Sequence, residues 1–131
     1  MRPILFAVLA ASALTVSVSA ASAAGDAAAG EAKYKVCRVC HQIGENAKNF
    51  VGPELNSVVG RKAGSVPGYN YSDANKNSGL VWDEATLTKF LRKPREVVPG
   101  TKMAFPGMAG DDDIANVIAY LKQFGPDGKK M

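Results

Sequence analysis

The most chemically reactive side chains in this sequence lie within five consecutive positions. Cys37 and Cys40 are its only cysteines, and His41 is its only histidine. Two thiols three positions apart, followed directly by an imidazole, form the C-x-x-C-H pattern by which a c-type haem is attached. The thiols add to the two vinyl groups of the haem, and the imidazole binds the iron. The pattern therefore predicts one covalently bound haem c, with Cys37 and Cys40 as thioether attachments and His41 as an axial ligand.

Other functions of a C-x-x-C segment explain less of the sequence. A thioredoxin-like disulfide is conceivable in an oxidising compartment. However, no strand-helix-strand pattern surrounds the two cysteines, and His41 would have no role. A structural zinc ion needs four ligands, and the sequence has no second pair of cysteine or histidine residues. A disulfide-exchange module remains a third hypothesis, and it predicts a colourless protein.

The sixth position of the iron separates a carrier from an enzyme. With no second histidine, a protein ligand must be Met, Lys or Tyr. Met103 is the first candidate because it follows the stiff, non-helical stretch Pro99–Lys102, which can present a thioether to a metal; Met108 is the second. An iron bound by both His41 and Met103 has no vacancy for substrate, so it exchanges an electron and is no enzyme. An open or labile position would instead indicate a haem peroxidase or a gas-sensing protein.

Composition predicts one small globular domain. Of the 131 residues, 47% are hydrophobic and 21% charged, which argues against disorder and against a multidomain enzyme. The formal net charge is +4 without a clustered basic run, so nucleic acid is not an expected partner.

The N-terminal segment has the pattern of a secretory signal peptide. Arg2 supplies a positive start, and the apolar run Ile4–Leu14 is too short to span a bilayer comfortably. Ala21-Ser22-Ala23 then gives an A-x-A pattern, so we expect cleavage after Ala23, with Ala24 as the alternative. Residues 1–23 would be the cleaved signal peptide and 24–131 a single exported domain. The length of the apolar run disfavours an uncleaved membrane anchor.

Helices and long loops must position the reactive residues. Apolar residues recur at helical spacing in several segments, whereas residues 42–68 and 97–110 carry Gly and Pro at intervals typical of irregular connections. We expect helices from Asp26 to about Val39, from Ser72 to before Gly79, from Asp83 to before Pro94, and from the Asp111–Asp113 run to Gly125. The fold class is therefore all-α. A chain with so few apolar side chains needs something else to fill its centre.

From Gly25 to Phe124 the sequence resembles class I c-type cytochromes, most closely the bacterial cytochrome c2 branch, which is related to mitochondrial cytochrome c. The resemblance implies a small cytochrome c fold, with three to five helices and long loops wrapped around one covalently bound haem. Besides the C-x-x-C-H pattern, it rests on Gly25-Asp26, Gly30, Tyr34, Gly52-Pro53-Glu54-Leu55, Gly60-Arg61-Lys62, Pro67-Gly68-Tyr69, Tyr71–Asn77, Trp82, Pro99–Met103 and Ile118–Lys122.

The resemblance also implies a role for each matching residue. Met103 would be the axial ligand opposite His41, and the Pro53 carbonyl would accept the second imidazole N–H of His41. Three residues, Arg61, Tyr71 and Trp82, would surround a haem propionate, and Thr101 and Asn75 would make hydrogen bonds near the buried carboxylate and the Met103 side. In the scaffold, Gly30 and Tyr34 would contact Val117, Tyr120 and Leu121 of the last helix.

The resemblance implies a periplasmic one-electron carrier that works as a monomer. Its partners would be membrane complexes, with a cytochrome bc1-type donor and a photosynthetic reaction centre or a terminal oxidase as acceptor.

Two departures from the family pattern concern the haem surroundings and the partners. Phe90 stands where mitochondrial relatives have a tyrosine near the methionine ligand, and Val36 precedes the first cysteine. The basic ring around the haem edge is also thinner than in those relatives. One hypothesis is that the remaining basic residues steer this edge toward acidic docking faces, and the alternative is that they form an ordinary solvated surface. They are Lys35, Lys48, Lys62, Arg92, Lys93, Arg95 and Lys102.

Overall fold

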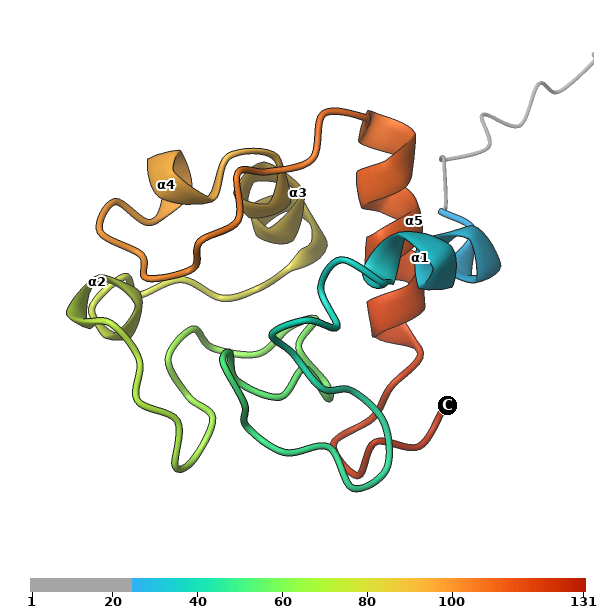
Figure 1. Cartoon of the computed structure of the whole chain (residues 1–131), viewed down its shortest axis with the longest axis horizontal. Helices are drawn as coiled ribbons and strands as arrows, with labels where there is room; N and C mark the ends of the chain where they lie inside the picture. The colour runs from blue at the N-terminus through green and yellow to red at the C-terminus, as the bar shows by residue number, and fades with distance from the viewer. Residues whose placement is uncertain (1–24) are drawn as a thin grey trace, which may run out of the picture.

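The computed structural model describes residues 25–131, and this part of the chain contains five helices (Figure 1). The predicted signal peptide, residues 1–23, lies outside the described residues. Within these residues, β-type pairing is limited to two isolated bridges, which confirms the predicted all-α class. The helices are α1 (Ala27–Tyr34), α2 (Asp73–Lys76), α3 (Glu84–Arg92), α4 (Pro94–Val97) and α5 (Asp111–Lys122).

Three of the predicted helix starts are confirmed by side-chain caps. Asp26 accepts hydrogen bonds from the Ala28 and Ala29 amides, and Ser72 accepts one from Asn75. Asp83 accepts one from the Thr86 amide at the start of α3. Each cap provides an acceptor for an amide at the open end of a helix.

The predicted end of the first helix is wrong. α1 stops at Tyr34 rather than near Val39, and the chain continues in tight turns. The Cys37 amide donates to the Tyr34 carbonyl at 2.8 Å, and the Cys40 amide donates to the Cys37 carbonyl at 3.1 Å. These bonds span three residues and alternate with four-residue bonds from Arg38 to Tyr34 and from His41 to Cys37, so the segment forms a series of turns rather than a continuous α-helix.

α4 was not predicted. Pro94 ends α3 as expected, but it also begins a new single turn, because a proline at the first helical position needs no amide partner. The Val98 amide donates back to the Pro94 carbonyl at 2.9 Å and closes this turn.

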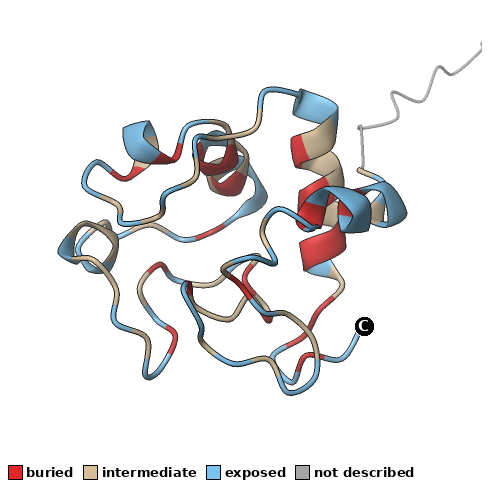
Figure 2. Cartoon of the chain, in the orientation of Figure 1, coloured by how far each residue is buried: buried red, intermediate tan, exposed pale blue. Residues whose placement is uncertain are grey.

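α1 crosses α5 in close contact, and buried residues concentrate on the inner face of α5 (Figures 1 and 2). Gly30 permits the approach because a Cβ there would overlap the Asn116 carbonyl of α5. Tyr34 is 1% exposed, and its ring lies 5.1 Å from that of Tyr120 between centroids. The predicted contact between these two helices is therefore confirmed.

The long irregular segments are held by specific hydrogen bonds rather than by regular structure. The Asn56 side chain binds both backbone groups of Gly44, at 2.8 and 3.0 Å. The Trp82 amide donates to the Arg61 carbonyl at 2.8 Å, and the Gly60 amide donates to the Trp82 carbonyl at 2.7 Å. These bonds fix the segment before α2 against the segment before α3. None of the helices in residues 25–131 has both the length and the apolar character needed to cross a bilayer.

Candidate haem site

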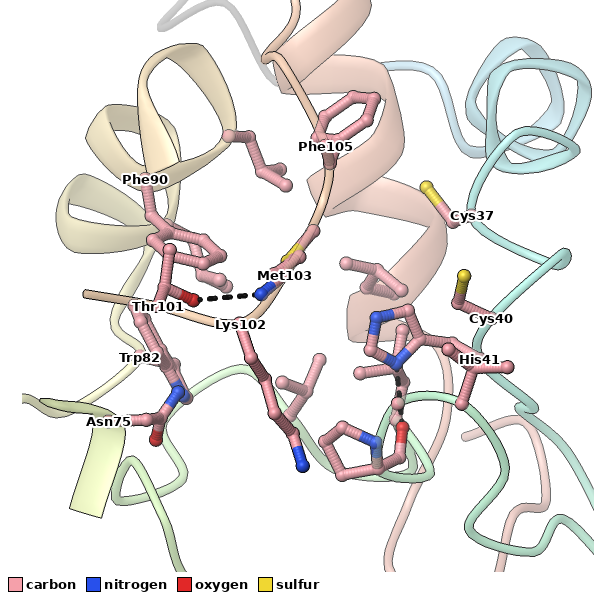
Figure 3. Close-up of a pocket in the computed structure, with 18 of the residues that line it drawn as sticks. Cys37, Cys40, His41, Asn75, Trp82, Phe90, Thr101, Lys102, Met103 and Phe105 are labelled. Carbon is pink, nitrogen blue, oxygen red and sulfur yellow. Dashed lines mark hydrogen bonds between the residues drawn. The ribbon is translucent and has the colours of Figure 1, made fainter. Parts of the chain in front are cut away.

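All ten residues predicted to bind the haem or its iron line one cavity of about 560 Å³ (Figure 3). They are Cys37, Cys40, His41, Pro53, Arg61, Tyr71, Asn75, Trp82, Thr101 and Met103. Pockets for organic ligands are typically about 300–1,000 Å³, so the cavity can hold a large ligand. The fold brings these residues together from the turns after α1, from the long irregular segment before α2, from α2 itself, and from the segments before α3 and after α4.

One wall of the cavity carries the two thiols and the imidazole. Cys37 and Cys40 are free thiols and are partly buried. Burial, together with the nearby Cys40, raises the pKa of the Cys37 thiol. The His41 amide donates to the Cys37 carbonyl at 2.9 Å, which places His41 beside the thiols. The tight turns thus present all three side chains to the same cavity.

The His41 ring is fixed by a hydrogen bond to the Pro53 carbonyl, 2.7 Å from Nδ1. If Nδ1 carries the proton, Nε2 is left without one and faces the cavity (Figure 3). Burial lowers the pKa of the imidazole, the Pro53 carbonyl opposes this shift, and the Arg61 charge adds to it. The result favours a neutral imidazole, which is the form that binds a metal.

The backbone around Gly52 closes tightly over the same ring. The Gly52 amide donates to the Cys40 carbonyl at 2.8 Å, and the Phe50 amide donates to the Gly52 carbonyl at 2.9 Å. A Cβ on Gly52 would lie 2.7 Å from His41 Nδ1 and 2.9 Å from Nε2. Glycine is therefore required here for close packing against the imidazole.

The opposite wall is formed by the segment that carries Met103 (Figure 3). Thr101 Oγ1 accepts a hydrogen bond from the Met103 amide at 3.2 Å. This bond fixes the backbone from which the thioether extends. Phe90 lies on the same side of the cavity, buried against Trp82 with ring centroids 4.7 Å apart. Met108 packs against the core but does not line the cavity, which favours Met103 as the ligand.

The polar side chains of Asn75, Tyr71 and Arg61 line the cavity. Asn75 Oδ1 is buried without a hydrogen-bond partner, which makes it a candidate acceptor for a ligand. Tyr71 accepts the Val66 amide at 3.0 Å, and burial is the main cause that raises the pKa of its phenol. Arg61 donates to two backbone carbonyls, those of Asn56 at 2.9 Å and Glu54 at 3.0 Å. Much of its hydrogen-bonding capacity is therefore used within the chain, and a bond to a propionate stays a prediction.

Sequence reasoning missed the contacts made by two residues that line the cavity, Lys102 and Tyr69. Lys102 donates to the Asn70 carbonyl, and its ammonium lies 4.5 Å from the centroid of the Tyr69 ring. The Tyr69 hydroxyl in turn donates to the Val51 carbonyl at 2.7 Å. These three contacts join segments far apart in the sequence, and neither residue type nor spacing indicates them.

The residues present suit a covalently bound haem. Two free thiols and an imidazole stand on one wall, a thioether stands on another, and the rest of the lining is mainly apolar. The orphan acceptor of Asn75 provides a polar contact. The fold and site define a small helical protein of the kind built around a covalently attached haem, which would occupy the cavity that the side chains leave open.

Comparisons with known proteins identify the family. A family model described as cytochrome c matches residues 27–125. The chain is 54% identical over 131 residues to cytochrome c-554 of Methylosinus trichosporium, with 99% of each sequence covered. It is 60% identical over 103 residues to cytochrome c2 of Rhodomicrobium vannielii, which covers 79% of this chain and 82% of that protein.

Solved structures agree with these sequence matches. Cytochrome cH from Methylobacterium extorquens superposes with a TM-score of 0.71 at 50% identity, covering 75% of this chain and 98% of the other. Cytochrome c2 from Rhodospirillum centenum gives a TM-score of 0.74 at 38% identity, covering 78% of this chain and 100% of the other. The chain belongs to the cytochrome c family, as a class I member of the cytochrome c2 branch. It is an electron carrier with one covalently bound haem c.

Proposed function

We propose that this protein is a periplasmic carrier in which His41 and Met103 close both axial positions of the haem iron. The observation that carries the proposal is that His41, beside the two cysteines, and Met103 lie on opposite walls of one cavity. A closed iron leaves electron exchange as its chemistry. This favours a carrier over a peroxidase or gas sensor, which need an open or easily vacated position.

When bound, the haem supplies reversible one-electron chemistry, and the chain's residues control its surroundings. The Pro53 carbonyl holds the Nδ1 proton of His41, which orients the ring and raises its basicity as a ligand. Thr101 fixes the backbone of Met103. Apolar side chains such as Leu91 and Val117 exclude water from the cavity. A rigid, dry site changes little between oxidation states, which favours rapid electron exchange.

The surface beside the cavity suits docking through apolar contact. Val36, Val39 and Val51 line the cavity and are 60%, 70% and 61% exposed. Two of the predicted steering residues are engaged in ion pairs, Arg92 with Asp111 and Lys93 with an acidic neighbour on α4. We therefore expect steering by the other basic residues to be modest, with apolar contact at the haem edge completing the complex.

The proposed partners are membrane complexes, with a bc1-type donor and a reaction centre or terminal oxidase as acceptor. The test mixes the oxidised holoprotein with washed membranes that contain a bc1-type complex and a quinol, and follows haem reduction at several salt concentrations. We expect reduction that is blocked by a bc1 inhibitor and slows moderately with salt. Failure to accept electrons, combined with tight carbon monoxide binding or peroxide turnover by the native protein, would favour the enzyme or sensor.

Export is tested separately. The proposal expects the periplasmic fraction to contain a protein that begins at Ala24, or at Gly25 for the alternative cleavage site. Intact mass and N-terminal sequencing of the haem-containing protein measure this directly. A mature protein that keeps residues 1–23, or that is recovered from the cytoplasm, would contradict the proposed signal peptide and location.

A further inference from the structure

A positively charged side chain lines the haem cavity, and a negatively charged side chain lies next to it outside that cavity. Arg61 lines this cavity, and its side chain is only 16% exposed. Glu54 Oε1 lies 3.6 Å from Arg61 Nη1, and the Glu54 side chain is 23% exposed. Both groups are largely removed from water, so solvent screens their charges less than it screens surface charges.

Glu54 stands behind Arg61 rather than inside the haem cavity. It lines a second, smaller cavity of about 360 Å³. Arg61 lines both cavities, whereas Glu54 lines only the second, so Arg61 is the member of the pair that borders the haem cavity. The Glu54 carboxylate therefore offsets part of the positive potential that Arg61 would otherwise exert on the haem.

The position of the Glu54 carboxylate is fixed. Its Oε2 accepts the Asn56 amide at 2.6 Å, while its own backbone carbonyl accepts Arg61 Nη2 at 3.0 Å. Arg61 Nη1 also donates to the Asn56 carbonyl at 2.9 Å. The two side chains are thus held by one short segment, and the carboxylate has little freedom to turn away toward solvent.

We propose that Glu54 sets the reduction potential of the haem protein by balancing the charge of Arg61. The inference rests on the proposed function, because it concerns the haem that this cavity would hold. Reduction adds one negative charge to the haem, so an unbalanced guanidinium in the wall favours the reduced state. The fixed carboxylate offsets that effect and holds the potential lower than Arg61 alone would set it.

The test substitutes Glu54→Gln in the full-length exported protein and measures the midpoint potential of the purified holoprotein. Glutamine keeps an oxygen that can accept the Asn56 amide, so the substitution removes charge with little change in shape. We expect the midpoint potential to rise because loss of the carboxylate charge favours the reduced haem. At a fixed solution potential, the ratio of reduced to oxidised protein should increase by roughly threefold to tenfold. At about 59 mV per tenfold change for one electron, this corresponds to about 30–60 mV.

The matched control is Glu96→Gln. Glu96 also pairs with a basic residue, Lys93 at 3.4 Å, but its side chain is 70% exposed and it lines neither cavity. Its substitution removes the same charge and should shift the potential far less. Glu54→Asp, which keeps the charge, should shift it less than Glu54→Gln. If Glu54 had a purely structural role, Glu54→Asp, with its shorter side chain, should change the potential more than Glu54→Gln.

Each outcome bears on the inference. A rise for Glu54→Gln that clearly exceeds the Glu96→Gln shift supports it. An unchanged or lower potential, or equal shifts in the two variants, overturns it. If every variant still takes up one electron reversibly and keeps the wild-type ferric spectrum, such a result leaves the carrier function intact. Failure of the wild-type protein to take up an electron reversibly would instead contradict the proposed function itself.

Discussion

Gly52→Ala tests whether the packing around His41 is as tight as the structure indicates. The φ angle of Gly52 is outside the left-handed range, so alanine meets no conformational barrier there. Its Cβ, however, would lie 2.7 Å from His41 Nδ1, whereas carbon contacts are normally about 3.5–4.0 Å. The hydrogen bonds of Gly52 to Cys40 and Phe50 restrain the backbone, so the imidazole must shift by about 1 Å.

The expected cost has two parts. Overpacking typically costs about 1–3 kcal/mol, and loss of the hydrogen bond between His41 and Pro53 adds about 0.5–1.5 kcal/mol. A domain of this size loses about 4–8 °C in Tm per kcal/mol, so a total cost of about 1.5–4.5 kcal/mol should lower Tm by roughly 6–36 °C. Circular dichroism of the holoprotein measures Tm, and proton exchange of the His41 Nδ1–H reports the hydrogen bond.

The control for Gly52→Ala is Gly110→Ala. At Gly110 an added Cβ meets nothing closer than Asp113 Oδ2 at 3.4 Å, an ordinary contact. Its cost should be at most about 1 kcal/mol, since Gly110 is an N-cap position without a side-chain cap. If Gly52→Ala lowers Tm no more than Gly110→Ala, and the Nδ1 proton stays protected, the argument from close packing is refuted.

Two further predictions concern the scaffold. Helix propensity alone would make Gly30→Ala stabilising by about 1 kcal/mol. Because the added Cβ would overlap the Asn116 carbonyl, we expect the substitution to be destabilising instead. Urea unfolding measures the change in the free energy of unfolding and so gives its sign. Asp83→Ala should lower Tm at neutral pH, because the Thr86 amide lowers the pKa of the Asp83 carboxyl and the charged form stabilises α3. Since the folded pKa is the lower one, this stabilisation is lost as pH falls, so the Tm difference should shrink below about pH 4. A Tm difference that is constant with pH would contradict the role of the charged cap.

Local features of the sequence predicted much of the fold. Asp26, Ser72 and Asp83 are of the residue types favoured at helix N-caps, and a cap acts within three residues of its own position. The end of α1 was mispredicted because the apolar spacing continues to Cys40 although the chain tightens after Tyr34. The periodicity of apolar residues indicates which face of a segment is buried, but it does not indicate where an α-helix gives way to tighter turns.

The candidate site was predictable where a compact motif carries the chemistry. Cys37, Cys40 and His41 follow from their spacing, and the structure places them in one cavity with Met103. The contact of Lys102 with the Asn70 carbonyl could not be predicted, because it joins residues 32 positions apart and involves a backbone acceptor that any residue supplies. The charge balance in the cavity wall likewise depends on how a loop folds.

The most direct test of the central claim is the visible absorption spectrum of the ferric protein in the wild type and in two methionine variants. An iron bound by a methionine thioether gives a weak charge-transfer band at long wavelength. We expect this band in the wild type and in Met108→Ala, together with a low-spin Soret band, and its loss in Met103→Ala. A high-spin wild-type spectrum without the band, or a band that survives Met103→Ala, would contradict closure of the iron by Met103.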